Sequence, residues 1–175
     1  MLNLRGWRIR RVCFLALSAV LLIGFIISIM TAGPWQAFKL RRELNDATRL
    51  IVRTGGHCHR YFEKERTLYD TTSSDEIHGL LECIGFDSPP MGSCRCCGDM
   101  SFDFYRGEQL VKSFSYHHKS ALRIQYVSGG DFSLTRKARI QLEEWLNKRT
   151  IYEKFKQVQE ELSVIDTGED DRMAP

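Results

Sequence analysis

The feature that most constrains this chain is an uninterrupted apolar stretch near its N-terminus. Residues 12–32 read VCFLALSAVLLIGFIISIMTA, which is 21 residues without a charged side chain. As an α-helix rising 1.5 Å per residue, this stretch can cross a hydrocarbon core of about 30 Å. Trp7 and Trp35 flank it, where aromatic side chains sit at headgroup level. We therefore expect a transmembrane helix over 12–32, with the lipid bilayer as a partner.

The charges on either side of this segment predict its orientation. Residues 1–11 contain four arginines and no acid, whereas the basic residues that follow the segment are mixed with Glu43 and Asp46. The positive-inside rule then favours a cytoplasmic N-terminus over 1–11 and a C-terminal domain outside the cytoplasm, in a single-pass protein of the cell membrane. A cleaved signal peptide is the alternative, but its apolar region is normally only 7–15 residues long.

Net charge bears on the kind of partner. The chain has 25 Lys and Arg against 22 Asp and Glu, and four of the basic residues lie in 1–11, so the remainder is close to neutral. It lacks the basic excess of nucleic-acid-binding proteins, and we expect no nucleic-acid partner. Inside the apolar segment Gly24, Ser28 and Ala32 recur every four residues, a spacing that allows close helix contact. The sequence therefore leaves open whether the chain forms a homodimer, and it identifies no protein partner.

An amphipathic helix is expected directly after the apolar segment. Apolar residues recur there at spacings of three and four, namely Ala37, Leu40, Leu44, Ala47 and Ile51. We predict a juxtamembrane helix over 33–56 that ends at the Gly55-Gly56 pair, because glycine favours the left-handed cap of a helix. Leu50 to Val52 alone would also suit a strand, but the longer periodicity favours the helix.

The rest of the chain predicts a small α+β domain over 57–149. Alternation in 57–62 and 66–70 suggests a hairpin, and Ser73 to Glu76 forms a capping-box sequence before a short helix that ends near Gly85. Three alternating segments from Met100 to Tyr126 predict an antiparallel meander, followed by helices near 134–149 and over 150–165. Residues 166–175 are expected to be a disordered acidic tail. The order of elements predicts helices packed on one face of an antiparallel sheet.

The cysteines and histidines of this domain are the candidate site residues. Cys94-x-x-Cys97 has the spacing of a zinc knuckle, with Gly98 to relieve the turn. The remaining ligands would come from Cys58, His57, His59 or the His117-His118 pair. Strand alternation puts His117 and His118 on opposite sides, so we expect at most one of them in a shared site. The sequence thus offers Cys58, Cys94, Cys97 and His117 as candidate ligands, with zinc as the cofactor.

Disulfides are the competing interpretation of the same cysteines. A bridge from Cys58 to Cys94, Cys96 or Cys97 would staple the domain, as is common in oxidising compartments. Cys83, beside the apolar stripe of the capped helix, is expected to be a buried and inert thiol. A thiol nucleophile is the third alternative, and an enzyme is the less favoured class.

Two further residue sets carry weaker expectations. Arg123 lies between two apolar residues and is expected to point to solvent, and residues 116–118 could line a small ligand cleft. Together these patterns predict a membrane-anchored protein that presents a non-catalytic binding or structural domain. A zinc-binding sensor or metal-dependent domain that uses the Cys/His cluster is the alternative.

Overall fold

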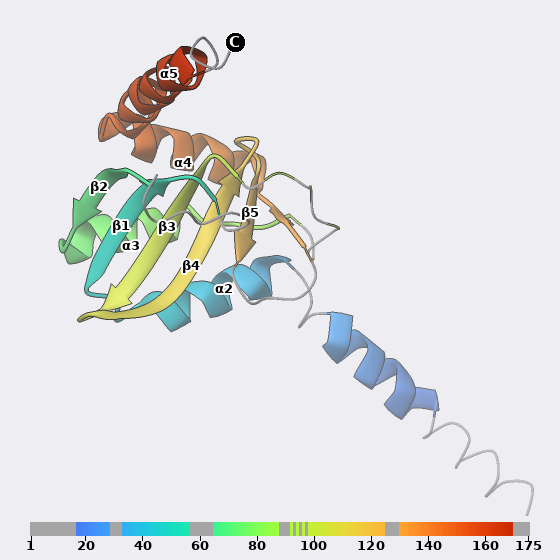
Figure 1. The fold of residues 1–175 in the computed structure, drawn as a ribbon. Helices are drawn as coiled ribbons and strands as arrows, with labels where there is room; N and C mark the ends of the chain where they lie inside the picture. Colours follow the sequence, from blue (N-terminus) through green and yellow to red (C-terminus); the bar gives the residue numbers. More distant parts are fainter. Residues whose placement is uncertain are drawn as a thin grey trace, which may run out of the picture.

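The computed structural model of the chain describes residues 17–28, 33–56, 65–87, 92, 94, 96, 98–124 and 130–169, with side chains up to 162 in the last helix. After a helix over Leu17–Ser28, the elements follow in this order: α2 (Gly33–Leu44), β1 (Arg49–Thr54), β2 (Thr67–Thr71), α3 (Ser74–Glu82), β3 (Met100–Arg106), β4 (Gln109–His117), β5 (Ala121–Ile124), β6 (Phe132–Ser133), α4 (Arg136–Lys148) and α5 (Ile151–Glu169). Five helices and one antiparallel sheet confirm the expected α+β class (Figure 1).

The described strands form a six-stranded antiparallel sheet in the order β2-β1-β3-β4-β5-β6. The predicted meander is confirmed as β3, β4 and β5, which are joined by tight turns and pair in sequence order. Strand β1 lies between β2 and β3, so the segment that precedes the expected domain supplies one of its central strands.

The predicted helix over 33–56 is wrong in its second half. Helix α2 ends at Leu44, and residues 49–54 form β1 instead. Leu50, Ile51 and Val52 are all buried, and β1 has a hydrogen-bonded strand on each side. Three consecutive buried positions suit a central strand, whereas an amphipathic helix would expose one of them. Pairing with strands distant in sequence therefore determined the secondary structure of residues 49–54, since tertiary pairing often overrides local periodicity.

The predicted hairpin between 57–62 and 66–70 stays a prediction, although its second strand is present as β2. Residues 57–62 lie outside the described part of the chain, and β2, over Thr67–Thr71, pairs with β1. Among the described strands, β2 therefore pairs with β1, whose residues local periodicity had predicted to be helical.

One face of the sheet carries the apolar core. Alternate residues of β1, β3, β4 and β5 are buried there, and α2, α3 and α4 add their apolar sides, as expected for helices on one face (Figure 1). The strand residues of this core are Leu50, Val52, Leu68, Met100, Phe102, Phe104, Phe114, Tyr116, Leu122, Ile124 and Phe132. Since Ala37, Leu40 and Leu44 of α2 belong to the same core, α2 and β1 are part of the folded unit.

Helix α3 begins as its sequence predicts. Ser73 is its N-cap and its hydroxyl accepts a hydrogen bond from the backbone N–H of Glu76. The carboxylate of Glu76 contacts the hydroxyl of Tyr69 and the guanidinium of Arg149, so only the serine half of the capping box is seen. Ile77, like the other apolar residues of the stripe, is fully buried. The helix ends at Glu82, three residues before Gly85, with Cys83 as its C-cap.

The opposite face of the sheet is polar and buried. In register across four strands lie Arg53, Ser101, Ser115 and Arg123. Ser101 and Ser115 are almost completely buried, as is Asp103, which forms an ion pair with Arg53. Buried polar side chains are costly unless they are paired, and Asp103 accepts hydrogen bonds from Arg53 and Ser113. His117, on the same face, connects it to the cysteine loop.

The expected transmembrane helix is not confirmed as a span. Among the described residues, no single helix is both long enough and apolar enough to cross a bilayer, and only the pair Leu17–Ser28 and Gly33–Leu44, bent by 58°, meets the criteria together. The eight large apolar side chains of Leu17–Ser28 are all exposed, from 46% to 65%.

The C-terminal end also differs from its prediction. The helix expected over 150–165 is present as α5, but it continues to Glu169, so 166–169 are helical and not part of a disordered tail. Each added helical residue needs only a local hydrogen bond, and acidic composition does not prevent it. Residues 170–175 lie outside the described residues, and their assignment as a tail stays a prediction.

Candidate functional site

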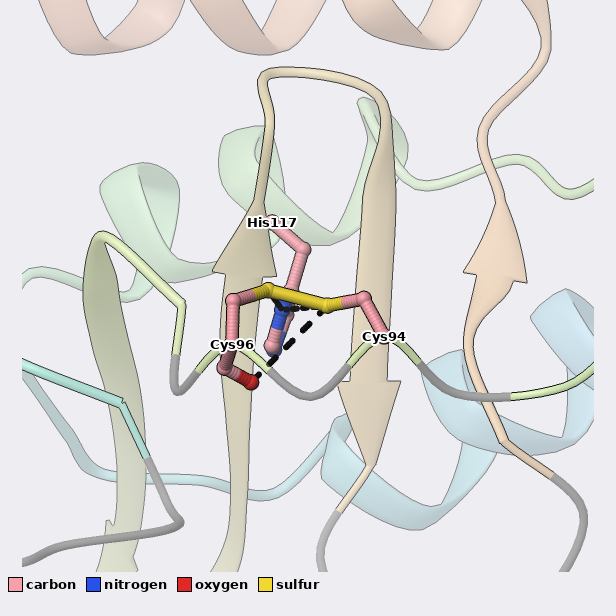
Figure 2. Close-up of side chains that lie close together, drawn as sticks. All are labelled: Cys94, Cys96 and His117. Atoms are coloured by element: carbon pink, nitrogen blue, oxygen red, sulfur yellow. Dashed lines mark hydrogen bonds between the residues drawn. A yellow bond between two sulfur atoms is a disulfide. The ribbon is translucent and has the colours of Figure 1, made fainter.

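Two cysteines and a histidine converge beside the end of β4. The Nδ1 atom of His117 lies 3.4 Å from Sγ of Cys94 and 3.1 Å from Sγ of Cys96. One ligand atom from each of the three lies within 4.8 Å of the other two. Figure 2 shows the His117 ring pointing toward the two sulfur atoms. The structure thus joins Cys94 and His117 of the predicted ligand set and adds Cys96.

Cys94 and Cys96 are bonded to each other as a disulfide (Figure 2). This bridge joins residues only two apart, whereas the disulfide expected from the sequence ran to Cys58. Cys58 and Cys97 lie outside the described residues, so their part in a disulfide or a metal site stays a prediction. A bridge over so short a loop restrains its own turn and does not staple distant elements together.

His117 is held in one orientation by its strand neighbour. It is the last residue of β4 and fully buried, and its Nε2 atom lies 2.7 Å from the hydroxyl oxygen of Ser115. When Nε2–H donates to Ser115, the lone pair of Nδ1 faces the sulfurs, which is how a hydrogen-bonded neighbour selects the ligating nitrogen. Burial, helped by the positive charge of Arg123, lowers the pKa of His117 and favours the neutral imidazole that binds metals.

His118 also reaches the sulfurs, against the expectation from strand alternation. Its Nε2 atom lies 3.1 Å from Sγ of Cys96, although its neighbour His117 contacts the same sulfur. Alternation fails because His118 has left the strand: its φ is +50°, in the left-handed region, and it begins the turn to β5. Both adjacent histidines can therefore serve one site, and His118 is the solvent-exposed one.

Arg123 is a site residue that the sequence analysis placed in solvent. Its side chain is 17% exposed and donates to the carbonyl oxygens of Cys94, at 2.8 Å, and Cys96, at 3.0 Å. Asp131 pairs with Arg123 and also accepts from the backbone N–H of Cys94. Burial alone would raise the pKa of Asp131, but these hydrogen bonds outweigh it and lower the pKa. The sequence around Arg123 could not show this role, because Asp131 is eight residues away.

Glycine is required where the cysteine loop rejoins the sheet. Gly98 has a φ of +91°, and a Cβ atom there would lie 2.9 Å from Nε2 of His117 and 3.0 Å from the carbonyl oxygen of Tyr116. The sequence predicts that Gly98 relieves a tight turn, and the structure adds that it lets the chain pass against the histidine. Gly92 and Gly130 make a similarly close approach at the other end of the loop.

Cys83 lies apart from this cluster, as expected. It is the one free cysteine among the residues described with side chains, and its thiol donates to the carbonyl oxygen of Gly79 in the same helix. Burial raises the pKa of the Cys83 thiol, which keeps it protonated and unreactive.

The geometry of the cluster suits a soft metal ion once the sulfurs are reduced. In a tetrahedral zinc site with Zn–S of about 2.3 Å and Zn–N of about 2.0 Å, sulfur and nitrogen ligands lie about 3.5 Å apart. The distances of 3.4 Å and 3.1 Å from Nδ1 of His117 are close to this value. The two sulfurs would have to separate, so the disulfide and the metal-bound dithiolate are mutually exclusive states of one site.

No known protein family, no curated protein and no solved structure matches the chain.

Proposed function

We propose that this chain is a single-pass, membrane-anchored protein whose α+β domain is a zinc-binding module without catalytic activity. The observation that carries the proposal is the convergence of Cys94 Sγ, Cys96 Sγ and His117 Nδ1 within 4.8 Å. Two thiolates and an imidazole select zinc over hard cations such as magnesium or calcium. His118 supports a fourth ligand position, because its Nε2 atom already contacts Cys96.

The surroundings of the cluster support a metal site. Ser115 orients the ring of His117, and Arg123 and Asp131 fix the backbone of both cysteines. The guanidinium also lies 3.4 Å from Sγ of Cys94, where it would offset the negative charge of a thiolate. Such hydrogen-bonded support around the ligands typically changes metal affinity 10–100-fold.

The membrane anchor is supported by the character of Leu17–Ser28. Its large apolar side chains are exposed on all sides, so the folded domain does not cover them. A helix that is apolar all round is stable in lipid and unstable in water. The unopposed arginines of 1–11 favour a cytoplasmic N-terminus, which would place the domain outside the cytoplasm.

A second candidate function rests on the Cys94–Cys96 disulfide. In an oxidising compartment the bridge would persist, and the domain would then be a metal-free, non-catalytic binding or structural module. The two candidate functions differ in the redox state of Cys94 and Cys96: the zinc module needs two reduced thiolates, whereas the metal-free module keeps the disulfide.

The deciding experiment is the native mass of the full-length protein in detergent, isolated without chelator and compared with its denatured mass. Zinc binding predicts one zinc ion in the native state, lost on denaturation to leave the fully reduced chain. A denatured mass about 2 Da low, with no native excess and no zinc uptake after reduction, would reject the zinc module and leave the oxidised one. In C94S/C96S the zinc should disappear, whereas in C83S it should remain. Carbonate extraction tests the anchor separately: release of the chain into the supernatant would contradict it.

A further inference from the structure

A pocket of about 390 Å³ opens beside the Cys/His cluster, between the turn after β4 and the start of α4. Its volume lies in the range of small-molecule sites. Figure 1 shows the turn between β4 and β5 against the N-terminal end of α4. The residues that line the pocket are His118, Lys119, Ser120, Arg136, Arg139, Ile140 and Glu143.

The pocket concentrates positive charge. Its lining contains three basic residues, Lys119, Arg136 and Arg139, and a single acidic one, Glu143. Two of the cations lie in the first turns of α4, which has no acidic residue in its first turn. Cations at the positive end of a helix dipole are unfavourable, whereas an anion there is stabilised by both the dipole and the side chains. The pocket therefore has the electrostatics of an anion site.

The turn that forms one wall of the pocket is strained. His118 and Lys119 have φ values of +50° and +55°, and the turn is closed by a hydrogen bond from the backbone N–H of Ser120 to the carbonyl oxygen of His117. Turns of this kind are most readily formed by Asn-Gly, and each non-glycine residue in the left-handed region costs free energy. Histidine and lysine occupy these positions, and both residues line the pocket.

We propose that this pocket binds the phosphoryl group of a small, soluble phosphorylated compound. Two guanidinium groups offer the planar, paired donors that match phosphate oxygens, and Lys119 adds a third cation. The volume leaves room for an organic group beside the phosphate. In Figure 1, α2, which follows the apolar helix, lies at the other end of the strands from α4. This separation favours a soluble ligand over a lipid headgroup. The proposal stands on the pocket alone, whether or not zinc binds nearby.

The test uses full-length protein in nanodiscs of zwitterionic lipid, titrated with inorganic phosphate and with glycerol 3-phosphate by calorimetry. We expect saturable binding that weakens at least tenfold in R136Q/R139Q. The matched control is K137Q/K148Q, which removes the same charge from α4 but no residue of the pocket, and it should change affinity less than twofold. An equal loss in both variants, or no saturable binding, would overturn the proposal.

Two further measurements separate the remaining outcomes. In K119G the pocket loses a cation while the turn gains its preferred residue, so the affinity should fall although the melting temperature rises. If the affinity were unchanged, Lys119 would not contact the ligand, and the proposed site of three cations would be wrong. Nanodiscs that contain phosphatidic acid test whether the phosphoryl group comes from a lipid or from a soluble compound. If phosphatidic acid in these discs weakened the binding of glycerol 3-phosphate, a lipid headgroup would occupy the pocket, and the proposal of a soluble ligand would be overturned.

Discussion

Arg123 and Asp131 form a clamp over the cysteine loop. The Nε atom of Arg123 lies 2.6 Å from Oδ1 of Asp131, and the two side chains are only 17% and 13% exposed. The same guanidinium donates to the carbonyl oxygens of Cys94 and Cys96, while Asp131 accepts from the N–H of Cys94. Two residues of neighbouring segments thus fix the backbone that presents both sulfurs.

Replacement of Arg123 by lysine should weaken zinc binding about 10–100-fold, because one ammonium cannot reach both carbonyls and the carboxylate. Asp131→Asn should lower the free energy of unfolding by about 1–3 kcal/mol, since a partly buried guanidinium loses its counter-ion. Zinc competition titration and urea unfolding measure the two effects. Asp70→Asn removes the exposed pair with Arg49 and should leave zinc affinity unchanged. An unaltered affinity in Arg123→Lys would show that the clamp does not position the ligands.

Reduction of the Cys94–Cys96 bridge should have a small effect on stability. The entropy of closing so short a loop amounts to about 1.5 kcal/mol, against about 4 kcal/mol for the loop of roughly 37 residues that a bridge to Cys58 would close. Unfolding of the metal-free protein with and without reductant measures the difference. A loss near the larger value would indicate a long-range bridge. After reduction, added zinc should raise the melting temperature, and a chelator should reverse the gain.

Gly98→Ala should be strongly destabilising. The left-handed backbone costs an alanine about 1–2 kcal/mol, and its Cβ would press on His117 Nε2 and the carbonyl of Tyr116. We expect a total loss of about 2–4 kcal/mol, together with loss of zinc binding, as the loop is pushed from the histidine. Gly107→Ala is the control, because its φ is also positive but its Cβ would meet open space. Equal losses of stability in the two variants would show that the positive φ alone, and not the contact of the new Cβ atom with His117, causes the destabilisation.

Lys119→Gly should increase stability. A residue at a φ of +55° is strained unless it is glycine, so we expect a gain of about 0.5–1 kcal/mol. The same substitution at Lys137, inside α4, should cost about 1 kcal/mol because glycine is a poor helix former. Thermal unfolding of both variants measures whether each substitution raises or lowers the stability. A loss of stability in Lys119→Gly would show that the lysine side chain, which lies over the ring of Tyr152, stabilises the turn.

Two buried tyrosines should make the domain sensitive to alkali. Burial raises the pKa of Tyr152 to about 12 and also raises the pKa of Tyr116, from an ordinary value of 10.0. Because the folded pKa is the higher one, the stability that these groups contribute is present below pH 10 and is lost as the pH rises toward 12. Urea unfolding at several pH values in this range measures the loss of stability, and the absorbance of tyrosinate measures the ionisation of the tyrosines. Tyr152→Phe should show a weaker dependence, and an identical pH profile would contradict the assignment.

Local signals predicted the elements that depend on neighbours in sequence. The N-cap at Ser73, the meander from β3 to β5 and the helices α4 and α5 all follow from residues a few positions apart. Caps, turns and hydrophobic periodicity act over one or two turns of the chain, so they can be read without the fold. The assignment of Cys94 and His117 to one site came from the Cys94-x-x-Cys97 spacing and from residue type, because thiolate and imidazole are the ligands that zinc prefers.

Tertiary structure decided whatever depends on distant pairing. Residues 49–54 became a strand because β2 and β3 hydrogen-bond to both sides of it, which outweighs their helical spacing. Arg123 joined the site because Asp131 and the cysteine carbonyls gather around it, and His118 joined because its backbone turns out of the strand. Sequence by itself therefore determined the class of fold and the chemistry of the candidate ligands. The sheet order, the partner of each sulfur and the anion pocket required the folded chain, since they arise where segments far apart in sequence meet.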